Sequence, residues 1–400
     1  MVLLTMKEKN KIEVISHVMD GMIDVEEGGR VLNRSVRQIY RMLKKLRDEG
    51  LEGLQHGNKG RVSPRKIKKA IREKITDLAR GKLKDINDTQ LTEILDREEK
   101  IKMSRVSVRR ILREAGIAPK LKRRSPKHRS RRERKESFGM MLQIDASRHD
   151  WLEGRGSWLT IVGAIDDATN FAWARFVDAE TTWSYLDLLE EIALNQGLPL
   201  SLYSDRHSIF YVLREATLEE QIKNEKALTQ FGRAMEEMGI NLIKAWSPQA
   251  KGRIERFWKT LQDRLVVELR LAGAKTQEEA QVVLNLFLKE YNRQFILPAR
   301  QESVFRKSPK ASHLSRILCL KETRTVAKDH TISFEGLIFQ IPPSRLYRSL
   351  AKRKVDVLQL KDGSVEIVYK QTTVARFRPE AVSRLADNYG DRKCQLKKAA

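Results

Sequence analysis

The chain of 400 residues is long enough for two to four domains, and its 78 lysines and arginines exceed its 53 acidic residues by 25, with an isoelectric point of about 10.0. This excess of positive charge indicates a polyanionic partner, which can be DNA, RNA or an acidic membrane surface. The sequence has no apolar run near the roughly 18 residues of a membrane span, no apolar N-terminal patch long enough for a signal peptide, and two widely separated cysteines, Cys319 and Cys394, so it argues against a membrane-spanning protein, a disulfide framework and a cysteine-based zinc site and favours the cytoplasm.

A helix-turn-helix DNA-binding domain is predicted for residues 1–57. Helices are expected from Asn10, over 25–32 and over 36–48, with Ser35 as the N-cap of the third. The apolar face of that helix is formed by Val36, Ile39, Tyr40, Leu43 and Leu46. Its polar face and the turn before it carry Arg34, Arg37, Gln38 and Arg41. An ordinary solvated helix remains the alternative, but arginine and glutamine at the helix start favour a recognition helix that reads base edges.

Residues 58–118 predict a second helical domain, which we interpret as another helix-turn-helix. Its helices are expected over 63–80, from Asp88, and over 105–115 with Ser104 as N-cap. The last helix can bury Val106, Val108, Ile111 and Leu112. It leaves Arg105, Arg109 and Arg110 outside. Two such modules would read a longer DNA end than one.

Residues 119–138 form a linker dense in basic residues, among them Arg123 and Arg124. A basic run is usually just solvated. Its place between two predicted DNA-reading domains and the next segment favours contacts with DNA phosphates.

The segment 139–300 predicts an α/β core. Strands are expected over 140–144, 158–165, 171–177, 200–204 and 240–245, and helices over 183–195, 229–238, 253–269 and 277–291. The first three strands form a meander, and the strands on either side of helix 183–195 should run parallel. Asp166 and Asp167 lie in the turn after the second strand, where aspartates are common turn formers, so we do not expect them to bind metal.

Three carboxylates of this core can converge on one point. Asp145 and Asp205 end the strands 140–144 and 200–204, and Glu255 lies in the first turn of helix 253–269. Such a cluster needs a compensating charge, and Mg²⁺ or Mn²⁺ prefers carboxylate oxygens. The side chains expected to hold DNA phosphates around it are Gln249, Lys251, Arg256 and Lys259. If Lys259 instead forms an ion pair with Glu255, that glutamate would be structural.

The C-terminal part predicts a linker over 301–323, a small β domain over 324–385 and a basic tail over 386–400. Short strands are expected over 325–326, 331–334, 337–341, 354–360 and 365–369. Asp362-Gly363 is a hairpin signal between the last two. Five short strands with polar ends suggest a small β-barrel.

Three local motifs carry a resemblance to a known family. Residues 205–210 begin with Asp205 and end with a phenylalanine, residues 247–256 read Ser-Pro-Gln-Ala-Lys-Gly-Arg-Ile-Glu-Arg, and residues 291–292 are Tyr-Asn. Between Asp145 and Asp205 lie 59 residues, and between Asp205 and Glu255 lie 49. In this order they resemble the motifs of DDE transposases and retroviral integrases. Over about residues 20–385 the chain is most similar to bacterial insertion-sequence transposases of the ISNCY group. The last interval is longer than in many members, and we read the surplus over 212–228 as an inserted surface helix.

The resemblance implies a multidomain protein with an RNase H-like catalytic core, helix-turn-helix modules before it and a small β-barrel after it that binds DNA or partner subunits. It implies that Asp145, Asp205 and Glu255 are catalytic and hold two Mg²⁺ or Mn²⁺ ions. The enzyme would cut the ends of its insertion element and join the 3′ ends to target DNA by metal-dependent phosphoryl transfer. Its partners would be terminal inverted repeats, target DNA and at least one further copy of itself, in the bacterial cytoplasm at the nucleoid.

Two other functions stay open at this point. One is a sequence-specific DNA-binding regulator with an inactive core, against which the intact acids speak. The other is a stand-alone RNase H-like nuclease, which would not need two N-terminal DNA-reading domains.

Overall fold

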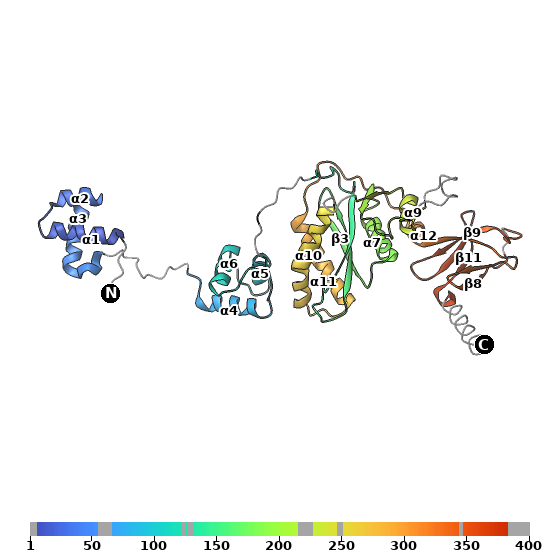
Figure 1. Ribbon diagram of the computed structural model, residues 1–400, viewed down its shortest axis with the longest axis horizontal. Coiled ribbons are helices and arrows are strands. Elements are labelled where there is room, and N and C mark those ends of the chain that lie inside the picture. Colours follow the sequence, from blue (N-terminus) through green and yellow to red (C-terminus); the bar gives the residue numbers. More distant parts are fainter. Residues whose placement is uncertain are drawn as a thin grey trace. The chain divides into compact units, whose positions relative to one another are not determined.

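The computed structural model describes residues 6–54, 66–121, 125, 132–214, 227–245, 251–343 and 347–382. The chain divides into two compact units, Met1–Lys74 and Ile75–Ala400; Figure 1 labels many of their elements and colours them along the sequence. Most of the expected inserted helix, over 215–226, and the basic tail over 386–400 lie outside the described residues.

Residues 6–54 of the first unit form three helices and a short 3-10 turn: α1 (Met6–Met19), α2 (Val25–Leu32), α3 (Val36–Glu49) and η1 (Gly50–Leu54). Its core is formed by Ile15, Val18, Ile39, Leu43, Leu46 and Leu54. The three helices confirm the predicted order. The apolar face of α3 is narrower than predicted, since Val36 and Tyr40 are 41% and 59% exposed. A core this small covers only a thin stripe of a helix surface.

Three more helices follow: α4 (Lys69–Arg80), α5 (Asp88–Arg97) and α6 (Arg105–Glu114). Ser104 caps α6 as predicted, because its hydroxyl accepts from the Ser107 N–H at 3.2 Å. Two predictions were wrong. Residues 66–68 are not helical, and Lys66 and Lys68 place positive charge where a helix N-terminus disfavours it. Val106 is 72% exposed, because it lies two residues before Val108 and so points away from the buried face.

A five-stranded mixed sheet forms the centre of the second unit. Its strands, in spatial order, are β3 (Ala172–Val177), β2 (Leu159–Asp166), β1 (Leu142–His149), β4 (Ser201–Ser204) and β5 (Asn241–Lys244). The first three pair antiparallel as a meander, while β4 is parallel to both β1 and β5. Strands β3 and β4 run in the same direction, as predicted, but β2 and β1 lie between them.

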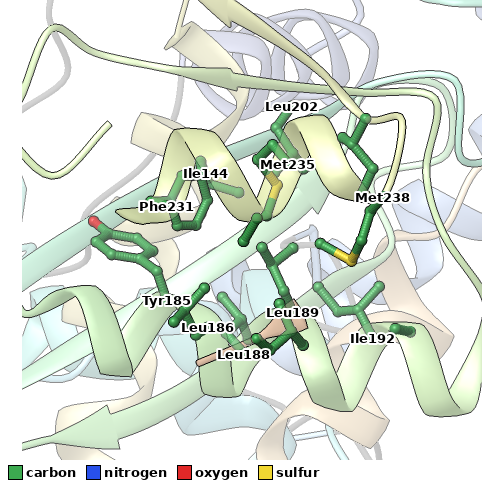
Figure 2. Close-up of a cluster of buried hydrophobic side chains, with 14 of the residues drawn as sticks. Ile144, Tyr185, Leu186, Leu188, Leu189, Ile192, Leu202, Phe231, Met235 and Met238 are labelled. Atoms are coloured by element: carbon green, nitrogen blue, oxygen red, sulfur yellow. The ribbon is translucent and has the colours of Figure 1, made fainter. Parts of the chain in front are cut away.

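Helices cover both faces of this sheet. On one face lie α7 (Thr182–Asn195) and α9 (Gln230–Glu237), and on the other α10 (Gly252–Leu271) and α11 (Gln277–Phe295). Figure 2 shows the first of these layers, where side chains from both helices meet Ile144 and Leu202. Side chains alternate along a strand, so Gln143 and Asp145, which flank Ile144, point to the opposite face, where α10 lies.

The C-terminal region consists of α12 (Ala311–Ile317) and two small sheets. One has the order β11 (Thr372–Phe377), β10 (Val365–Tyr369), β9 (Lys354–Gln359) and β6 (Leu320–Thr325), and the other is the hairpin β7 (Thr331–Phe334) and β8 (Leu337–Gln340). They enclose one apolar core. The prediction that these strands close into a barrel was therefore wrong. A barrel needs every strand paired on both sides, and within the described residues β6, β11, β7 and β8 each pair with a single strand.

Strand β11 was missed because the turn before it has no glycine or asparagine. Lys370 and Gln371 both adopt positive φ, 47° and 66°, as the favoured two-residue hairpin turns require.

None of the described helices combines the length and apolar composition that crossing a bilayer requires.

Candidate active site

Asp145 and Asp205 are brought together by the register of two parallel strands. β1 and β4 pair Leu142 with Leu202 and Gln143 with Tyr203. Two residues further along, the same register sets Asp145 beside Asp205. The prediction that Asp145 ends its strand was wrong. Strand β1 continues to His149, because β2 pairs with it along all eight residues. It lies instead where the shorter β4 stops.

Both carboxylates contact a single ammonium group. Lys251, at the N-cap of α10, places Nζ 2.7 Å from Oδ1 of Asp145 and 3.4 Å from Oδ2 of Asp205. The two oxygens therefore lie no further apart than the sum of these distances. The side chain of Asp205 is 49% exposed, whereas that of Lys251 is only 10% exposed. Negative charge is thus concentrated at one point that opens to solvent on the Asp205 side.

A tryptophan holds Asp145 from the other side. The Trp258 indole Nε1 donates to Oδ2 of Asp145 at 3.1 Å. The ring fits there because Gly163, which faces Asp145 across the sheet, has no side chain. A Cβ on Gly163 would lie 2.6 Å from the Trp258 ring. Asp145 is therefore fixed by one hydrogen bond to each of its oxygens.

Glu255 lies on the same face of α10 as the two residues that hold Asp145. It follows Lys251 by four residues and precedes Trp258 by three, spacings that share one side of a helix. Its side chain is exposed. Among the described residues no ion pair joins it to Lys259, so the structural role that such a pair would give it has no support.

Two carboxylates that converge, with a third on the same face of α10 as Lys251 and Trp258, are the hard oxygen donors that Mg²⁺ and Mn²⁺ prefer. As they stand, no three Asp, Glu, His or Cys side chains of the described segments lie close enough together to hold a metal ion. The donor chemistry fits a divalent cation, while the charge next to Asp145 is balanced by Lys251.

Gln143 positions the start of α10 and was not singled out from the sequence. It is fully buried, accepts from the Ile254 N–H at 3.2 Å and donates to Asp167 Oδ1 at 3.0 Å. A glutamine within the otherwise apolar run 141–144 was the available signal, because buried amides need partners.

Asp166 and Asp167 are structural, in line with their interpretation as turn residues. Asp166 accepts from the N–H groups of Gly139 and Thr169 at 2.9 and 2.8 Å, and burial raises the pKa of its carboxyl. Asp167 is fully buried and forms ion pairs with Arg132 and with Arg253, the latter at 2.7 Å. The end of the basic linker is therefore bound to the core.

The Tyr291-Asn292 motif also has a structural role. The Asn292 side chain accepts from the Ala172 N–H at 2.8 Å and donates to the Ala172 carbonyl at 2.9 Å. Tyr291 packs against Phe257 with ring centroids 5.1 Å apart, and burial raises its pKa to about 12. The motif fastens α11 to β3 and to α10.

Most predicted DNA-contact residues lie on the surface. The exposed residues of this group are Arg34, Arg37, Gln38 and Arg41 at α3, Arg105, Arg109 and Arg110 on α6, and Arg256 and Lys259 on α10. Arg123, Arg124 and Gln249 lie outside the described residues. Lys251 is the exception, since it is buried against the two aspartates.

Comparisons with known proteins find a helix-turn-helix family model and two relatives described as transposases. A family model described as a helix-turn-helix domain matches residues 10–66. The chain is 35% identical over 373 residues to y4bF of Sinorhizobium fredii, a protein described as a transposase, covering 92% of this chain and 80% of that protein. It is 32% identical over 397 residues to the transposase for insertion sequence IS1202 of Streptococcus pneumoniae, covering 90% and 84%.

Two of the solved structures with some similarity are catalytic cores of retroviral integrases. That of the BIV integrase catalytic core has a TM-score of 0.26 and 19% identity and covers 38% of this chain and 81% of its own. That of the HTLV-2 integrase core with magnesium has a TM-score of 0.31 and 14% identity and covers 41% and 92%.

Proposed function

Because the chain belongs to the transposase family of these two relatives, we propose that it cleaves the ends of its own insertion element and joins the freed 3′ ends to target DNA. The observation that carries the proposal is the meeting of Asp145 and Asp205 at the end of β4, with Glu255 on the helix face that holds Asp145. The activity is that of a DDE-type polynucleotidyl transferase.

In this proposal Asp145, Asp205 and Glu255 hold Mg²⁺ or Mn²⁺. The chemistry that two bound ions supply is activation of the attacking water or 3′-hydroxyl and stabilisation of the departing oxygen. Trp258 fixes one oxygen of Asp145, and the His207 N–H donates to Oδ1 of Asp205 at 3.1 Å. These contacts orient the carboxylates before DNA arrives, which is what a site that works by positioning and charge requires.

DNA would be bound in two ways. Exposed side chains of α3, and of α6 in the proposed second helix-turn-helix over 58–118, would read the element ends, while Arg256 and Lys259 would contact phosphates near the site. Joining both ends of one element to a target requires two active sites held together. We therefore propose at least a dimer on DNA.

The test is a supercoiled plasmid that carries the gene with its flanking DNA, incubated with the full-length protein and Mg²⁺ or Mn²⁺. We expect nicks at two defined flanking positions that need metal and disappear in Asp145→Asn, Asp205→Asn and Glu255→Gln. Glu278→Gln, an exposed glutamate on α11, is the matched control and should nick normally. Tight binding to the flanks without nicking under either metal would instead support a DNA-binding regulator. Cleavage of RNA–DNA hybrids without preference for the flanks would support a nuclease.

A further inference from the structure

Lys251 is the one buried residue among the predicted phosphate contacts that the structure describes, being 8% exposed. An ammonium group is costly to remove from water unless it is paired with opposite charge. Its two partners, at 2.7 and 3.4 Å, are the proposed metal ligands Asp145 and Asp205. Lys251 therefore supplies the positive charge that the two carboxylates need.

We propose that Lys251 competes with the divalent metal: its ammonium holds Asp145 and Asp205 together in the metal-free protein, leaves when metal is loaded, and then binds a phosphate of the DNA. This inference rests on the proposed function. It makes Lys251 a positioning residue that couples metal loading to DNA binding.

The competition follows from distance and charge. A divalent ion would take oxygens of Asp145 and Asp205 as ligands, and the ammonium already lies 2.7 and 3.4 Å from these two carboxylates. Two cations held by the same pair of carboxylates would repel each other strongly, all the more where water is partly excluded. Without either cation, Asp145 and Asp205 would repel each other instead. One of the two cations is therefore needed, and the other is disfavoured.

Coupling to DNA follows because the released ammonium needs a new partner. Lys251 stands at the start of α10, on the face that carries Glu255, and its flexible four-carbon stem lets the charge move without the backbone. A phosphate of the bound DNA is the anion that the proposed reaction brings to this place. By linkage, DNA that pairs with Lys251 raises the affinity for metal, and metal raises the affinity for DNA by the same factor.

The experiment measures Mn²⁺ binding to the full-length protein by calorimetry, without DNA and with a duplex of the element end. Lys251→Met should bind Mn²⁺ about tenfold or more tightly than wild type without DNA, within the usual range of such couplings. DNA should tighten Mn²⁺ binding by the wild type and have little effect on the variant. Lys289→Met, which removes one exposed lysine from α11, should match the wild type throughout.

Asp205→Asn separates the two ideas. If the wild type binds Mn²⁺ in a way that Asp205→Asn weakens, but Lys251→Met binds no more tightly, the inference is overturned and the metal site stands. If Asp205→Asn does not weaken Mn²⁺ binding, either in the wild type or in combination with Lys251→Met, the proposed metal site fails as well. Should Lys251→Met not fold, Lys251→Gln keeps a hydrogen-bond donor without the charge and must show the same tightening.

Discussion

Asp145 lies directly opposite Gly163 in the antiparallel pair of β1 and β2. The missing side chain at Gly163 is what lets the Trp258 ring lie against the sheet and donate to Asp145. A residue with no functional group thus shapes the site, because it sets how closely α10 can approach the strand that carries the first aspartate.

Gly163→Ala should therefore damage the site more than the fold. The added Cβ would lie 2.6 Å from the Trp258 ring and 3.1 Å from the Trp173 carbonyl, so the ring must shift away from Asp145. Overpacking of this kind costs about 1–3 kcal/mol. We expect a folded protein by circular dichroism whose plasmid nicking falls about tenfold or more. Unchanged nicking would show that the position of Trp258 does not matter.

Trp258→Phe removes the hydrogen bond and keeps a smaller aromatic ring in its place. Asp145 loses the N–H donor to Oδ2, a contact to a charged group worth about 1.5–3 kcal/mol. We expect nicking to fall about tenfold to a hundredfold with little loss of secondary structure. Trp158→Phe makes the same substitution at a ring that is 59% exposed and lies under Arg148, so it serves as the control; equal losses in both variants would contradict the assignment.

Asn292→Ala should destabilise the core. The change leaves the N–H and carbonyl of Ala172, a residue only 2% exposed, without the partners that Asn292 provides. Each unsatisfied buried group costs about 1–3 kcal/mol. Urea denaturation should show a free energy of unfolding lower by about 2 kcal/mol or more. Asn285→Ala, at an exposed position two turns earlier on α11, should change the free energy of unfolding by less than about 0.5 kcal/mol.

Glu153 should make stability depend on pH. Hydrogen bonds from Arg270 hold the pKa of its carboxyl below the usual value against the opposing effect of partial burial, and Arg155 adds to them. A lowered folded pKa stabilises the protein above the unfolded value of about 4.3 and is lost as pH falls through the folded pKa. Glu153→Gln should thus have a lower Tm than wild type at pH 7, and the gap should close below about pH 4. A gap that is constant with pH would point to packing instead of charge.

Arg37→Ala should weaken binding to the element ends. The side chain is exposed on α3, within the segment that matches the helix-turn-helix model. A lost base contact costs about 1–3 kcal/mol, roughly tenfold in affinity, with less effect on unrelated DNA. Electrophoretic mobility shifts with end and random duplexes would measure this. The same assay on Arg109→Ala tests the proposed second module: a loss confined to end DNA supports it, and no change contradicts it.

What the sequence determined by itself is the order and kind of the elements in the helical segments and the α/β core; in the C-terminal region it missed α12 and β11. Strands such as 201–204 and helices such as α3 and α7 were predicted to within a residue or two, because the periods of apolar residues and the capping signals are local. The helix-turn-helix and the transposase family could be read for the same reason, from motifs that are short and contiguous.

What only the tertiary structure decided is how distant segments meet. The register of β1 on β4 places Asp145 beside Asp205, and the approach of α10 brings Lys251 and Trp258 to Asp145. Lys251 was expected to contact DNA, yet it is buried as an ion-pair partner of the two aspartates. The C-terminal strands were expected to close into a barrel, yet they form two separate sheets. Both outcomes depend on packing between residues far apart in the chain, and a local sequence pattern does not specify which distant residues or charges will lie opposite each other.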